Sequence, residues 1–133
     1  MIYVDCVREK DKFIKLTPYF FLMKTSYVLA LVILAEEEFD IPYISEKLAL
    51  VKDKLPFLLI KKIPGGYWSE DAAIFARLLC EIRGLEKTNN INYRITEKGK
   101  WVLKEILKEA KEECSDELEE VCAILGYKLD ELL

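Results

Sequence analysis

The segment from Gly84 to Leu103, GLEKTNNINYRITEKGKWVL, changes its hydrophobic pattern twice over a short distance. A glycine ends one apolar run, a polar stretch leads into the alternating residues NYRIT, and a threonine and a second glycine open another apolar run. Alternation with a period of two is typical of a half-buried strand, whereas the flanking runs have helical spacing. Asn89 and Asn90 tolerate the positive φ angles of a tight turn, so the sequence predicts a small β-hairpin between two helices.

Several residues of this segment have a local structural reason to be where they are. Gly84 is expected to end the preceding helix as the left-handed residue after its last turn. Thr96 is predicted to cap the following helix, and Gly99 to let the first turn of that helix approach a neighbouring backbone closely. Three apolar residues are expected to anchor the hairpin on a helical core: Leu85, Tyr93 and Ile95.

A helix is predicted immediately before this segment, over the residues SEDAAIFARLLCEIR. Ser69 is a favourable N-cap residue, and Glu70 and Asp71 lie in the first turn, where the helix dipole favours negative charge. Apolar residues at helical spacing should face inward, in a stripe widened by Ile74 and Leu78: Ala72, Phe75, Leu79 and Ile82. The same spacing places four residues on the outward face: Glu70, Ala73, Arg77 and Glu81.

The stretch PYFFLMKTSYVLALVILA, residues 18–35, is apolar on every helical face. A helix here would begin at Pro18, or afresh at Thr25 or Ser26, and would run to about residue 38. Its length reaches the lower edge of what spans a membrane. However, Lys24 lies near its middle, where a charge is expensive, and three glutamates follow the stretch directly. We therefore expect a helix buried in the core and no membrane partner.

Two other regions have weaker patterns. At the N-terminus, Ile2–Val7 and Phe13–Leu16 are predicted to form a small hairpin. After residue 38, the residues DIPY are expected to end the first helix, and Ser45 is expected to cap the next, SEKLALVKDKL. Pro56 ends or kinks that helix, and the short apolar run Phe57–Ile63 fits either a helix or a strand.

The order of these elements resembles the winged-helix superfamily, over roughly Thr25 to Ala110. Its members commonly have Gly-Leu at the end of the third helix, a β-hairpin wing, and Thr-x-x-Gly opening a C-terminal helix. The corresponding residues are Gly84-Leu85, the hairpin around Asn89-Asn90, and the residues TEKG from Thr96. The resemblance implies a mainly α fold with a small β-hairpin (α+β). On this resemblance, the chain is expected to consist of an N-terminal extension over 1–24, a winged-helix domain over 25–110 and a C-terminal helical tail over 111–133.

The chain departs from the superfamily in one place. The second and third helices of a winged-helix domain are normally joined by a short turn, whereas here the residues LVKDKLPFLLIKKIPGGYW separate them. Within this insertion, Lys61 and Lys62 beside Tyr67 and Trp68 fit either a small basic–aromatic patch or a solvated loop.

Winged-helix proteins commonly contact duplex DNA through the exposed face of the third helix and through the wing. Arg77 has the chemistry to read a guanine or to bind a phosphate, although Glu70 and Glu81 on the same face would repel phosphates. The polar wing suits backbone contacts, and it suits an ordinary solvated hairpin equally well. Carried over to this chain, the resemblance gives these candidate DNA-binding residues: Ala73, Arg77, Lys87, Thr88, Asn89, Asn90, Asn92 and Arg94.

The charge distribution favours a second functional hypothesis. The net charge is −4, and residues 97–133 carry 6 basic and 11 acidic groups, whereas residues 69–96 carry 4 of each. A strongly basic face, the usual electrostatic footprint of a nucleic-acid binder, is therefore not evident. The alternative is a winged-helix protein–protein interaction module that does not bind DNA and contacts a protein partner through its acidic tail or an aromatic groove.

The tail has a near-heptad apolar stripe. Residues 97–125 fit either one long helix or two helices that meet at residues 114–116. A stripe of this spacing suits pairing with another helix, and we expect it to form a homodimer. The predicted interface residues are Leu103, Leu107, Ala110, Cys114, Leu118, Val121 and Leu125.

Composition also limits the chemistry. The chain has no histidine and no glutamine, and abundant Lys, Glu, Ile and Leu are typical of heat-adapted proteins. The four cysteines include no CxxC pair, so no metal is expected, and buried thiols or a disulfide both fit. No catalytic constellation and no cofactor motif is visible, so the sequence predicts a binding protein and no enzyme. No secretory signal follows Met1, which favours a cytoplasmic location.

Overall fold

The computed structural model describes residues 26–133, which are mainly helical with a small antiparallel sheet. This confirms the predicted α+β class. The predicted N-terminal hairpin and the first part of the apolar stretch lie outside the described residues. The helices are α2 (Ser26–Glu36), α3 (Ile41–Leu50), α4 (Glu70–Glu81), α5 (Glu97–Glu113), α6 (Ser115–Leu125) and α7 (Leu129–Leu132). The strands are β1 (Glu38–Phe39), β2 (Lys61–Ile63), β3 (Gly66–Trp68), β4 (Leu85–Lys87) and β5 (Tyr93–Ile95).

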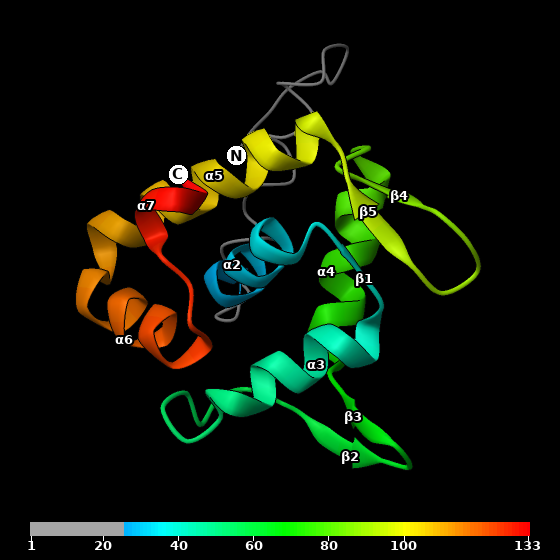
Figure 1. The fold of residues 1–133 in the computed structure, drawn as a ribbon, viewed down its shortest axis with the longest axis horizontal. Coiled ribbons are helices and arrows are strands. Elements are labelled where there is room, and N and C mark those ends of the chain that lie inside the picture. Colours follow the sequence, from blue (N-terminus) through cyan, green and yellow to red (C-terminus); the bar gives the residue numbers. More distant parts are fainter. Residues whose placement is uncertain (1–25) are drawn as a thin grey trace, which may run out of the picture.

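Helix α2 lies in the middle of the molecule (Figure 1). All its residues from Ser26 to Leu34 are buried, and it contacts α3, α4, α5, α6 and α7. A helix that is apolar on every face is stable only when other elements surround it. The expected core helix is therefore confirmed for the part of the stretch that is described. None of the described helices has the length and apolar character needed to cross a membrane.

Helix α3 begins earlier than the sequence analysis predicts. Asp40, not Ser45, is its N-cap: the Asp40 carboxylate accepts a hydrogen bond from the backbone N–H of Tyr43 at 2.8 Å, and Pro42 follows in the first turn. A carboxylate cap followed by proline is a strong start signal. Ser45 is instead buried within α3, where its hydroxyl donates to the carbonyl oxygen of Ile41 at 2.8 Å.

The insertion between α3 and α4 is partly a second hairpin. Helix α3 ends at Leu50, before Pro56, and residues 57–60 are neither helix nor strand. Strands β2 and β3 then pair in antiparallel fashion, with Lys61 opposite Trp68 and Lys62 opposite Tyr67. The apolar run is therefore a strand only in its last residues, and the basic–aromatic cluster belongs to a hairpin and not to a loop.

Three strands form the main sheet, in the order β1-β5-β4. The hairpin of β4 and β5 agrees with the prediction, whereas β1 is an additional strand that lies between α2 and α3 in the sequence. Leu85 and Ile95 are buried, and the ring of Tyr93 stacks on that of Phe39 with a centroid separation of 5.6 Å. All three predicted anchors therefore pack the hairpin against the core.

Two predictions need correction: the left-handed conformation of Gly84 and the positive φ angle of Asn89 in the hairpin turn. Arg83, with φ 64°, is the left-handed residue after α4, and Gly84 does not have a positive φ. Gly84 is required for packing, because a Cβ there would lie 3.1 Å from Cδ2 of Leu79 and 3.2 Å from Cα of Gly99. Asn89 has no positive φ either. It closes the hairpin tip through its side chain, whose Oδ1 accepts from the backbone N–H groups of Ile91 and Asn92 at 2.8 Å each.

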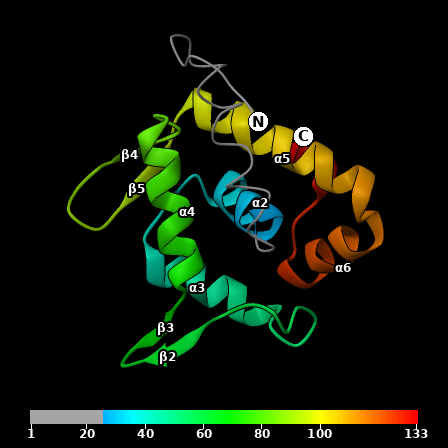
Figure 2. The ribbon, with the colours of Figure 1, turned by 180° about the vertical axis from the view of Figure 1, so that it is seen from behind.

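The tail consists of two helices. Helix α5 ends at Glu113 and α6 begins at Ser115, with a break at Cys114 (φ −145°, ψ 52°). The break lets α6 turn back against α2 and α3, on the opposite side of α2 from α4 (Figures 1 and 2). The tail and the rest of the described chain therefore share one hydrophobic core.

The apolar stripe of the tail faces this core, not a second copy of the chain. Six of its members are buried within the chain: Leu103, Leu107, Ala110, Leu118, Val121 and Leu125. The seventh, Cys114, is half-buried. The spacing of apolar residues along a helix indicates that one face is covered, but it does not indicate whether the same chain or a second chain covers it. In this structure the stripe is not available as a dimer interface. Cys80, Cys114 and Cys122 are free thiols, and burial raises the pKa of each.

Candidate nucleic-acid interface

Helix α4 is held rigidly at both ends. At its start, the hydroxyl of the predicted cap Ser69 accepts from the N–H of Ala72 at 3.2 Å, and the N–H of Ser69 donates to Oγ of Ser45 at 2.8 Å. Both serines are buried. At its end, Gly84 packs between Leu79 and Gly99. Ser45 is therefore a positioning residue for α4, a role that only the three-dimensional structure reveals.

The predicted inward stripe of α4 is buried, and its outward face is exposed. Glu70, Arg77 and Glu81 are exposed and Ala73 is half-buried, as the spacing predicts. Ile74 was expected to widen the inward stripe, but 37% of it is exposed. The outward face therefore presents one guanidinium between two carboxylates, together with a small apolar surface.

The wing consists of β4, β5 and the connecting tip, and it adjoins the end of α4 (Figure 2). Arg94 is not a free cation, because its Nε and one terminal nitrogen donate to Oε1 of Glu86 at 3.1 and 2.7 Å. This contact raises the pKa of Arg94. Lys87 is exposed, and its ammonium lies 5.4 Å from the centroid of the Tyr93 ring. The wing therefore offers one uncompensated cation, at Lys87.

The polar tip of the wing is less available than the sequence suggests. Thr88, Asn89 and Asn90 are exposed and Asn92 is half-buried, but Oδ1 of Asn89 is already used within the turn. Ile91, which was not a candidate, is 64% exposed at the same tip. A pocket of about 270 Å³ adjoins it, lined by Asp40, Ile41, Pro42, Trp68, Asn90, Ile91 and Tyr93.

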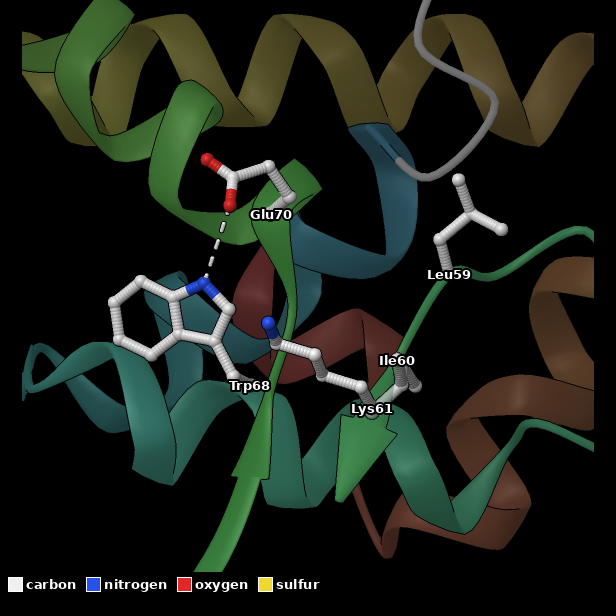
Figure 3. A pocket seen from close by; sticks show the side chains of 5 residues that line it. All are labelled: Leu59, Ile60, Lys61, Trp68 and Glu70. Atoms are coloured by element: carbon white, nitrogen blue, oxygen red, sulfur yellow. Dashed lines mark hydrogen bonds between the residues drawn. The ribbon is translucent and has the colours of Figure 1, made fainter. Parts of the chain in front are cut away.

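Trp68 lies between this pocket and a second one. The second pocket has a volume of about 330 Å³ and is lined by Leu59, Ile60, Lys61, Trp68 and Glu70 (Figure 3). The indole N–H of Trp68 donates to Oε2 of Glu70 at 3.3 Å, which ties β3 to the first turn of α4. The ammonium group of Lys61 lies beside the indole in this view.

The structure brings the predicted DNA-binding residues onto one side of the molecule. Helix α4 and both hairpins lie on the same side of α2, whereas α6 and α7 lie on the other (Figures 1 and 2). Within residues 26–133, no ion pair engages Lys61, Lys62, Arg77, Arg83 or Lys87. The acidic excess of the chain lies in residues 97–133, so it is concentrated on α5, α6 and α7. The acidic excess thus lies outside α4 and the wing, where residues 69–96 carry 4 basic and 4 acidic groups.

Comparisons with protein-family models, with curated proteins and with solved structures find no match to this chain. Within residues 26–133, no group of three or more cysteine, aspartate or glutamate side chains is arranged to hold a metal ion. A functional proposal for this chain therefore has to follow from its own topology, charge and surface.

Proposed function

We propose that the chain is a winged-helix DNA-binding protein that acts as a transcriptional regulator or an architectural factor. The topology supports this proposal: α2, β1, α3, α4 and the β4–β5 hairpin occur in this order, with β2 and β3 inserted between α3 and α4, and β1 pairs with β5 at the edge of the sheet. In this arrangement the wing adjoins the C-terminal end of α4, a helix whose outward face is exposed, and this single observation carries the proposal.

The contacts follow from the shape of a duplex. An α-helix fits the major groove, which is about 12 Å wide, and α4 would place Arg77 near base edges or a phosphate. Phosphate contacts of the wing would come from Lys87 and the backbone of the tip. Glu70 and Glu81 reduce the affinity of this face. We therefore expect binding of moderate strength and a strong dependence on salt.

The predicted homodimer is not part of this proposal, because the stripe that would form it is buried in the chain's own core. A dimer would need another surface. The salt-dependent binding to DNA can be tested with the protein in either state.

A titration of labelled duplexes at several salt concentrations tests the proposal. We expect wild-type affinity to fall steeply with salt, and Arg77→Gln to weaken binding about 10-fold or more. Lys108→Gln on α5 is the matched control, because it also removes one exposed positive charge but lies on the acidic tail. Absence of binding to any duplex at low salt would refute the proposal, and equal affinities of the two variants would remove Arg77 from the interface.

One observation favours a second candidate, a winged-helix module that binds a protein. Ile91 is exposed beside the apolar pocket that Trp68 and Tyr93 line, and an exposed apolar side chain next to an apolar pocket suits a protein partner. To test this candidate, the tagged protein is purified after nuclease treatment, and a protein partner that co-purifies with it is identified. We expect Ile91→Asp to abolish its capture and Ile124→Asp, an equally drastic change at an exposed isoleucine of α6, to leave it intact. Capture that both variants retain would exclude this pocket.

A further inference from the structure

We propose that the β2–β3 hairpin is a second phosphate-binding element of the protein. It would contact the DNA backbone at the opposite end of α4 from the wing. The inference rests on the proposed DNA-binding function, but it assigns a new contact to an insertion that a winged-helix domain does not ordinarily have. Its principal residues are Lys61 and Lys62.

The position of the hairpin is the first argument. Strand β3 ends at Trp68, and α4 begins at Glu70, so the hairpin leads directly into the first turn of α4. The wing leaves from the other end of α4, at Leu85. Both hairpins project on the same side of α2 as α4 (Figures 1 and 2). With 12 residues, α4 is about 18 Å long, so elements at its two ends can reach separate phosphates beside a groove about 12 Å wide.

Charge is the second argument. Lys61 and Lys62 are both exposed, and no ion pair engages either of them in the part of the chain that the structure describes. The arginine of the wing, Arg94, is by contrast neutralised by Glu86. Glu70 lines the same pocket as Lys61 without forming an ion pair with it, and its carboxylate accepts the indole N–H of Trp68. The two lysines are therefore exposed cations, one on each face of the ribbon, that can bind phosphates.

The hairpin is also firmly placed. Its register sets Lys61 opposite Trp68 and Lys62 opposite Tyr67, so each face of the ribbon carries one ammonium group and one aromatic ring. Strand β3 packs on α3, and the buried bond from Ser69 to Ser45 fixes the point at which the hairpin joins α4. A preformed contact loses less conformational entropy on binding than a mobile lysine-rich loop would.

The test uses the double variant K61Q/K62Q and the charge-preserving variant K61R/K62R. Each phosphate contact contributes about one unit to the slope of log affinity against log salt. We therefore expect K61Q/K62Q to lower this slope by about 2, to weaken binding equally for unrelated duplexes, and to lose protection of one backbone segment in a hydroxyl-radical footprint. We expect K61R/K62R to restore all three properties.

The control is K108Q/K111Q, which removes two exposed lysines from the tail helix α5. We expect it to keep the wild-type slope and footprint. If wild type binds duplexes and K61Q/K62Q shows an unchanged slope and footprint, the inference is wrong and the proposed function stands. If wild type binds no duplex at all, the proposed function and the inference both fail.

Discussion

Gly99 in the first turn of α5 lies directly against Gly84 at the start of the wing. A Cβ at Gly99 would be only 2.0 Å from the carbonyl oxygen of Gly84 and 2.9 Å from Cγ1 of Ile95. The N–H of Thr96 donates to that same carbonyl oxygen at 3.0 Å, which holds it in place. The hydroxyl of Thr96 accepts from the N–H of Gly99 at 3.1 Å and donates to the carbonyl oxygen of Arg83 at 2.7 Å. These contacts fix how the wing, α4 and α5 meet.

The first prediction concerns this contact. Gly99→Ala would force the backbones of α5 and the wing apart, because no flexible side chain can move to relieve the overlap. We expect it to lower the free energy of unfolding by about 3 kcal/mol, at the upper end of the cost of overpacking. Gly66→Ala is the control: it has open space around its Cβ position and no positive φ, and we expect a change within about 0.5 kcal/mol. Equal urea midpoints for the two variants would contradict this account.

The second prediction concerns Glu37, whose φ of 66° is unfavourable for a residue with a Cβ. Glu37→Gly should remove a strain of about 1–2 kcal/mol, partly offset by the greater entropy of glycine in the unfolded chain. The ion pair that is lost, with the half-buried Lys100 at 3.8 Å, is long and partly solvated, so it contributes little. We therefore expect a gain in unfolding free energy of up to about 1 kcal/mol.

The neighbouring residue provides the control for Glu37. Glu38→Gly makes the same chemical change in strand β1, opposite Arg94, where glycine weakens a strand. We expect its melting temperature to fall and that of Glu37→Gly to rise. A fall in both would show that the left-handed conformation at Glu37 is not strained.

The sequence predicted the features of this fold that depend on a few neighbouring residues. The caps Ser69 and Thr96 and the inward stripe of α4 are local patterns, and they are observed as predicted. Gly99 was expected to approach a neighbouring backbone, but its partner Gly84 could not be named. Gly84 was assigned a left-handed conformation because glycine after a helix usually adopts it. In the structure Arg83 takes that conformation, and Gly84 instead provides the space that Gly99 needs.

Features that depend on a distant partner were not predictable from pattern alone. Ser45 fits an N-cap by its residue type, but it is buried and bonded to Ser69. The stripe from Leu103 to Leu125 indicates a covered face without naming what covers it, and the break at Cys114 lets the chain cover it itself. For the candidate site, the exposure of Arg77 follows from helix spacing. The pairing of Arg94 with Glu86 follows from hairpin register and would have been found by aligning the two strands.

The third prediction concerns pH. The hydroxyl of Tyr127 donates to Oε2 of Glu36 at 2.8 Å, and burial, followed by this hydrogen bond, raises the pKa of Tyr127 above its ordinary value. A phenol that ionises less readily in the folded than in the unfolded chain stabilises the fold fully below about pH 10. That contribution is lost as the pH rises toward the folded-state pKa. We therefore expect the free energy of unfolding to decrease with pH above about pH 10.

Denaturant unfolding between neutral pH and pH about 11 measures this decrease. Tyr127→Phe should make the decrease shallower, because the ionisable group is gone. Tyr27, whose hydroxyl donates to Glu117 and whose pKa is raised chiefly by burial, should contribute in the same direction. The double variant Tyr27→Phe/Tyr127→Phe should therefore have the shallowest profile. Parallel profiles for wild type and both variants would show that these tyrosines do not govern alkaline stability.

The last prediction tests whether the wing contacts DNA. Glu86→Gln removes the carboxylate that neutralises Arg94 and leaves the hairpin otherwise unchanged. The pair is exposed, so its loss should alter stability by less than about 1 kcal/mol. If the wing lies on the phosphates, freeing Arg94 should tighten duplex binding and increase the salt slope by about one unit. Glu105→Gln is the matched control, because it frees Lys108 from an equivalent pair on α5, away from the proposed interface. An unchanged affinity for Glu86→Gln, in a protein whose binding Arg77→Gln weakens, would place α4 on the duplex and leave the wing in solvent.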